Sequence, residues 1–170
     1  MDSLPPKVLI LGLGNELLGD DAVGIVVGRS VYEALSQKRL GLDLSYAAAE
    51  LGGWRLVDLL PGYDRIVIVD SVQGGGDVLG HCYRVALDGA DTAHLASSHG
   101  VSLADAIALA YPEPSTAAAV TIYGVEAERV WDFGEGLSEE LQRRMPAIVD
   151  ELVADVLPVL GVRGNPGRSA

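Results

Sequence analysis

The sequence has few cysteines, few aromatic residues and few positive charges. A single cysteine, Cys82, excludes an internal disulfide. No apolar run reaches the roughly 18 residues of a membrane span, and residues 1–6 lack the pattern of a signal peptide, so we expect a cytoplasmic protein with no membrane partner. The formal net charge of −12 repels phosphate groups, so we expect no nucleic-acid partner.

Several motifs of known hydrolases are also missing. The sequence contains no Gly-x-Ser-x-Gly elbow of a serine hydrolase. It contains no His-Glu-x-x-His helix, which argues against an ordinary zinc protease. We interpret Cys82 as a small buried hydrophobic residue, and His81 and His94 as loop histidines that bond to the backbone.

The elements that are present alternate between strands and helices. Apolar runs and periodicity predict strands at 7–13, 41–49, 65–69, 80–87 and 117–125, and helices at 23–35, 54–60, 102–110 and 138–160. This order predicts an α/β fold, which we expect to be a three-layer α/β/α sandwich around a mostly parallel, mixed five-stranded sheet. We expect one domain over residues 1–160 and a flexible C-terminal tail at 161–170.

A glycine-rich segment at 12–24 follows the first predicted strand. It invites a dinucleotide-binding interpretation, but Leu17 stands where that motif needs its third glycine. Asp20 is expected to cap the next helix, and two carboxylates, Asp20 and Asp21, suit a helix N-terminus. Gly24 is expected where the helix packs closely on the sheet.

Two further residues could carry chemistry. Asp70 follows the predicted strand 65–69, at the sheet edge where α/β proteins bind ligands, although it could also cap a turn. His99 precedes a predicted helix and could be a ligand or an ordinary loop histidine. Together, Asp21, Asp70 and His99 would suit a divalent metal and leave coordination positions open for a substrate or water.

The sequence resembles the hydrogenase maturation proteases, which trim the large subunits of nickel-containing hydrogenases. The resemblance spans about residues 7–160. It is strongest in Gly-Leu-Gly-Asn-Glu-Leu-Leu-Gly-Asp-Asp-Ala-Val-Gly at 12–24, Arg-Ile-Val-Ile-Val-Asp at 65–70 and Ser-Ser-His-Gly-Val-Ser-Leu-Ala-Asp-Ala at 97–106. The segments at 122–126 and 133–138 also resemble the family.

The resemblance implies that Asp21, Asp70 and His99 are both metal ligands and catalytic residues. It implies that the protein is an endopeptidase and that its partner is a hydrogenase large-subunit precursor. It also implies that this precursor supplies most of the nickel at the site, and that the protein is a monomer. Glu16 receives no ligand role. The segment 49–53 departs from a Gly-Gly-Thr-like turn of many members, and position 21 holds Asp where other members have Glu.

Two alternatives stay open at this point. The chain could be a metal-responsive chaperone or binding module that holds the same subunit without cutting it. It could also be a nucleotide-binding α/β domain, which a dinucleotide would stabilise against heat.

Overall fold

The computed structural model describes residues 4–50, 53–74, 78–86, 102–113 and 117–162. Its centre is a five-stranded sheet in the order β2-β1-β3-β5-β4. The strands are β1 (Lys7–Leu13), β2 (Asp43–Ala49), β3 (Arg65–Val72), β4 (Cys82–Val85) and β5 (Ala119–Glu126). The first three and β5 pair in parallel, and β4 runs antiparallel to β5.

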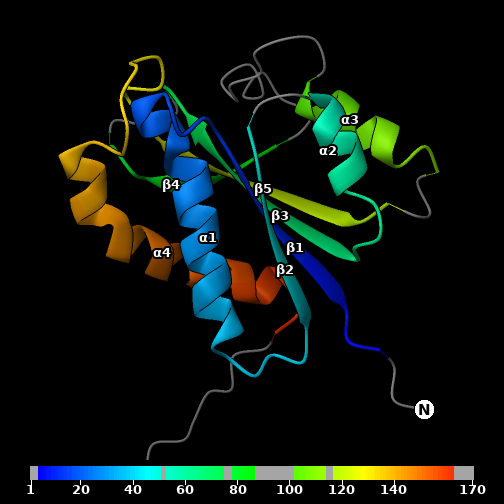
Figure 1. Ribbon diagram of the computed structural model, residues 1–170. Coiled ribbons are helices and arrows are strands. Elements are labelled where there is room, and N and C mark those ends of the chain that lie inside the picture. Colours follow the sequence, from blue (N-terminus) through cyan, green and yellow to red (C-terminus); the bar gives the residue numbers. More distant parts are fainter. Residues whose placement is uncertain (1–3, 51–52, 75–77, 87–101, 114–116, 163–170) are drawn as a thin grey trace, which may run out of the picture.

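Helices cover both faces of this sheet (Figure 1). On one face lie α1 (Val23–Ser36) and α4 (Glu139–Val159), and on the other lie α2 (Gly53–Leu59) and α3 (Leu103–Ala110). A short 3-10 turn, η1 (Gly19–Ala22), comes directly before α1. The predicted three-layer α/β/α fold and mixed five-stranded sheet are therefore confirmed.

The two hydrophobic cores follow from the alternation of side chains along the strands. In β1, Val8 and Ile10 face α1 and α4, whereas Leu9 and Leu11 face α2 and α3. All four are at most 1% exposed. A strand that is apolar on both faces is expected only where helices cover the sheet on both sides, as they do here.

Local sequence signals set several helix boundaries. Ser102 caps α3, because its hydroxyl accepts a hydrogen bond from the backbone N–H of Asp105 at 3.1 Å. The same hydroxyl donates to the Asp105 carboxylate at 2.7 Å, so Ser102 and Asp105 form only half of a capping box. The last helix, α4, continues through both Pro146 and Pro158.

Four of the five strands differ in length from the sequence-based expectation, β3 and β4 the most. The strand β3 was expected to end at residue 69 but runs to Val72, because its pairing with β5 continues in register up to Val72 and Glu126. Asp70 thus lies inside the sheet opposite Gly124, and it does not cap a turn. At the sheet margin, β4 is four residues long, shorter than the predicted 80–87.

Among the described residues, no helix combines the length and the apolar character needed to cross a membrane. Most of the expected tail at 161–170 lies outside the described residues, so it stays a prediction.

Candidate active site

The strand order reverses direction between β1 and β3. From β1 the chain passes through α1 to β2 on one side, and β3 then adds on the other side of β1. Such a switch point leaves a crevice at the carboxyl ends of the two strands, where open α/β sheets bind their ligands. Asp21 follows β1 and Asp70 lies near the end of β3, so both predicted residues reach this position.

Glycines allow the start of α1 to approach the sheet closely there. A Cβ atom on Gly24 would lie 2.2 Å from the Leu13 carbonyl oxygen and 2.8 Å from the Asp70 Cα atom. A Cβ atom on Gly14 would lie 2.0 Å from the Asp21 carbonyl oxygen, and the φ of Gly14 is +145°. The expectation that Gly24 permits close helix–sheet packing is confirmed, and this packing sets Asp21 beside β3.

Asp21 and Asp70 are both 1% exposed and are linked through Ser71. The Ser71 hydroxyl donates to Asp21 Oδ1 at 2.7 Å. The Ser71 backbone N–H donates to Asp70 Oδ1 at 2.8 Å. Asp21 Oδ2 is buried and has no hydrogen-bond partner. The ion pairs found among the described residues involve neither carboxylate.

The burial of two neighbouring carboxyl groups changes their acidity. Burial, and after it the negative charge of Asp21, together raise the pKa of the Asp70 carboxyl to about 8, although the hydrogen bond from Ser71 N–H acts in the opposite direction. Burial also raises the pKa of Asp21, while the hydrogen bond from the Ser71 hydroxyl opposes that rise. No ion pair among the described residues balances the negative charge of these two carboxylates, and a divalent cation would supply the positive charge.

The expected N-cap role of Asp20 is wrong. Ala22 is the N-cap of α1, and no side chain caps it. Asp20 lies in η1, where its Oδ1 atom accepts a hydrogen bond from the backbone N–H of Ser138 at 2.6 Å. The backbone of Gly19 and of Asp20 is also bonded to the chain after β5, and this holds Asp20 toward α4 and away from the α1 terminus.

His99 and His94 lie outside the described residues, so the third expected ligand stays a prediction. Within the described ranges, no three His, Cys, Asp or Glu side chains gather into a metal site. Glu16, which received no ligand role, is exposed. Cys82 is half-buried, and burial raises the pKa of its thiol to about 12, which fits an unreactive residue.

Sequence reasoning missed Ser71, the donor between the two carboxylates. The available signal was a polar residue directly after Asp70, where the apolar run 66–69 has ended. It could be recognised only once β3 was known to continue past Val69, because residues in a continuing strand alternate between its two faces.

Comparison with known proteins decides the family. The family model described as hydrogenase maturation protease, of the HycI type, matches residues 49–155. This chain belongs to the hydrogenase maturation protease family. The matched segment includes Asp70 and position 99 but not Asp21. No curated protein was found to match the chain.

Solved structures share the fold of this hydrogenase maturation protease. The chain resembles the [NiFe] hydrogenase maturation protease HybD from Thermococcus kodakarensis, with 26% identity, a TM-score of 0.58, and coverage of 91% of this chain and 99% of that one. An endopeptidase from Escherichia coli has a TM-score of 0.67 at 21% identity, covering 90% of this chain and 93% of that one. The chain is accordingly a protease of hydrogenase maturation with the fold of these relatives.

Proposed function

We propose that this endopeptidase removes the C-terminal extension of a hydrogenase large-subunit precursor and recognises the nickel already bound to that precursor. In this proposal Asp21, Asp70 and His99 complete the coordination of the nickel, and the protein acts as a cytoplasmic monomer. The observation that carries the proposal is the buried Asp21–Asp70 pair. Asp21 Oδ2 has no hydrogen-bond partner, and neither carboxylate joins an ion pair among the described residues, which supports a role in binding a cation.

The donor set fits a metal that arrives with its substrate. Two carboxylates and one imidazole occupy only part of a coordination sphere, and cysteine thiolates of the precursor would supply the other ligands. A precursor without nickel would lack this shared anchor and would be refused. The protease itself would need no permanently bound metal.

Cleavage of a peptide bond needs a polarised carbonyl and an activated water. Bound nickel would supply Lewis-acid chemistry. From this chain, Asp21 or Asp70 would accept the proton of the water. Ser71 would keep Asp21 in place, because its hydroxyl donates to Oδ1 and leaves the buried Oδ2 without a hydrogen-bond donor.

The test compares nickel-loaded with nickel-free precursor. Each is incubated with the protein, and mass spectrometry of the large subunit detects the loss of its C-terminal segment. We expect cutting of the nickel-loaded form alone. Equal cutting of both forms would contradict nickel recognition, and binding without shortening would identify a chaperone instead of a protease.

A further inference from the structure

Three large apolar side chains are exposed on two loops beside the candidate active site. Leu17 is 60% exposed, Trp131 is 66% exposed and Phe133 is 88% exposed. Leu17 lies in the loop between β1 and η1, four residues before Asp21. Trp131 and Phe133 lie in the connection between β5 and α4. We call these three residues the apolar rim. Exposed apolar groups that lie together are typical of interaction sites.

Backbone hydrogen bonds join the two loops. Gly134 N–H donates to the Leu17 carbonyl at 3.1 Å, and Gly19 N–H donates to the Gly134 carbonyl at 3.0 Å. Leu18 and Gly134 form a parallel bridge. Figure 1 shows η1 and the connection that leads to α4 side by side at one end of the sheet. The apolar rim is therefore a surface of fixed shape that adjoins the buried carboxylates.

Trp131 is held in place although most of its surface is exposed. Its indole Nε1 donates to Gln73 Oε1 at 3.2 Å, and Gln73 Nε2 donates to the Glu128 carbonyl at 2.8 Å. Gln73 directly follows β3, the strand that carries Asp70. An aromatic side chain whose orientation is already fixed loses little conformational entropy on binding, which is typical of an interface anchor.

The surface around the apolar rim is strongly acidic. Within residues 15–20 and 128–140, all of which are described, the one basic side chain is Arg129, and it is paired with Asp132 at 3.1 Å. Six exposed carboxylates share these segments: Glu16, Glu128, Asp132, Glu135, Glu139 and Glu140. Charge complementarity therefore favours a partner whose side chains are basic next to an apolar residue.

From these observations we infer that the apolar rim docks a segment of the large-subunit precursor in which basic residues flank an apolar or aromatic side chain. This inference rests on the function proposed above. Trp131 and Phe133 contact the apolar side chain, and the surrounding carboxylates attract the basic ones. The docking positions the precursor while Asp21 and Asp70 meet its nickel, so the apolar rim determines specificity and takes no part in the chemistry.

The test removes the apolar rim and measures binding separately from cutting. A Trp131→Ala/Phe133→Ala double variant should bind nickel-loaded precursor about ten- to thirtyfold more weakly, with KM raised similarly and kcat within about twofold. The matched control is Leu109→Ala, which removes an apolar side chain that is 51% exposed at the far end of α3. Circular dichroism and thermal melting verify that each variant folds.

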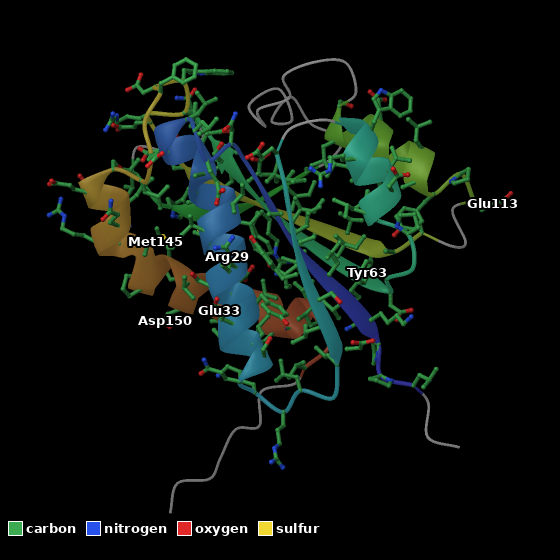
Figure 2. All side chains as sticks on the ribbon, in the orientation of Figure 1. Arg29, Glu33, Tyr63, Glu113, Met145 and Asp150 are labelled. Carbon is green, nitrogen blue, oxygen red and sulfur yellow. The ribbon has the colours of Figure 1, made fainter. Side chains whose placement is uncertain are left out.

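A charge variant tests the second half of the inference. Glu135→Lys should raise KM several-fold at low salt, and the difference from wild type should shrink as ionic strength rises. The control is Glu33→Lys, the same charge reversal at an exposed acid near the C-terminal end of α1, labelled in Figure 2. Equal effects of the two substitutions would contradict a local attraction.

The outcomes separate this inference from the proposed function. If wild type cuts the nickel-loaded precursor and the double variant cuts it with unchanged KM, the docking inference is wrong and the function stands. If wild type binds the precursor without cutting and the double variant loses that binding, the docking holds and the protease proposal fails. A wild type that sediments as a dimer, with a monomeric double variant, would assign the apolar rim to a second copy and overturn the inference.

Discussion

Two groups of carboxylates, one buried and one exposed to solvent, lie beside the same sheet, and their surroundings differ. Asp155 of α4 accepts hydrogen bonds from the Tyr123 hydroxyl at 2.7 Å and from Arg84 Nε at 3.0 Å. These bonds, first the one from Tyr123, hold the pKa of Asp155 below its usual range. The Asp21–Asp70 pair has no basic partner, and burial raises the pKa of both carboxyls.

The difference in surroundings indicates that Asp155 stabilises the fold, whereas the Asp21–Asp70 pair is available to bind a ligand. Asp155 ties α4 to β4 and β5, and the hydroxyl and guanidinium around it compensate its charge. Once the Asp70 carboxyl loses its proton, above its pKa of about 8, Asp21 and Asp70 repel one another in a site with little access to water, which destabilises the fold unless a cation joins them. The predictions below, from the largest expected effect to the smallest, test this contrast.

The largest effect is expected from removing the proposed ligands. Asp21→Ala, Asp70→Ala and His99→Ala should each lower the rate of precursor cutting by more than about a hundredfold. Mutation of a residue that only supports a metal ligand already lowers metal affinity or activity by about ten- to a hundredfold, and loss of the ligand itself should cost more. Gel analysis of the large subunit measures the loss, and circular dichroism verifies the fold. An active Asp70→Ala variant would remove Asp70 from the site.

The metal-free protein should become more stable when the buried repulsion is removed. Asp70→Asn should raise the free energy of unfolding by a few kcal/mol at pH 8, measured by urea denaturation. The Asp70 carboxyl has a pKa of about 8 in the native state and of about 4 in the unfolded state. Between these two pH values the native state therefore binds more protons than the unfolded state. Wild-type stability should therefore fall as the pH rises from about 4 to about 8.

The pH dependence of Asp155 should have the opposite sign. Its lowered native pKa contributes stability above the unfolded pKa, and this stability is lost as the pH falls through the native value.

A variant tests whether Asp70 causes the loss of stability toward pH 8. Asp70→Asn should abolish this decline in the free energy of unfolding, whereas Asp150→Asn, on the exposed side of α4 in Figure 2, should leave it unchanged. A decline that persists in Asp70→Asn would contradict the assignment.

Loss of the donor between the carboxylates should have a smaller effect. Ser71→Ala removes the 2.7 Å bond to Asp21 Oδ1 and leaves that carboxylate without its side-chain donor. We expect cutting of the nickel-loaded precursor to slow by about ten- to a hundredfold, the range found for outer-shell partners of metal ligands. Ser71→Thr keeps the hydroxyl and serves as the control, and an equal loss in both variants would indicate a packing effect instead.

The smallest effect is expected at the compensated cluster. Tyr123→Phe removes one donor to Asp155, which keeps its bond from Arg84. The free energy of unfolding should fall by about 1 kcal/mol, and the rate of cutting should not change. A large loss of activity in Tyr123→Phe would show that the residues around Asp155 contribute to function as well as to stability, and it would contradict the contrast with the Asp21–Asp70 pair.

The sequence predicted the parts of the site that depend on local patterns. Continuous apolar runs identified β1 and β3 as central strands, and the glycine spacing at 12–24 correctly indicated close helix–sheet packing. These features follow from side-chain periodicity and the size of a Cβ atom. The family model, over residues 49–155, and the related folds then confirmed the resemblance to the family.

The long-range contacts could not be predicted in the same way. Asp20 is bonded to Ser138, and Leu18 pairs with Gly134, but no local pattern links segments so far apart in sequence. The expected cap role of Asp20 was wrong for this reason, because a carboxylate at a helix start has several possible donors. The convergence of Asp21 and Asp70 required the strand order, and the position of His99 remains a prediction.

The bond between Asp20 and Ser138 spans 118 residues of sequence. Contacts of such high sequence separation form late in folding, because the intervening chain must be ordered first. During synthesis, the loop carrying Leu17 emerges early but has no partner until the start of α4 has left the ribosome. The edge of the site formed by residues 17–20 is therefore completed only after residues 129–138 have been synthesised.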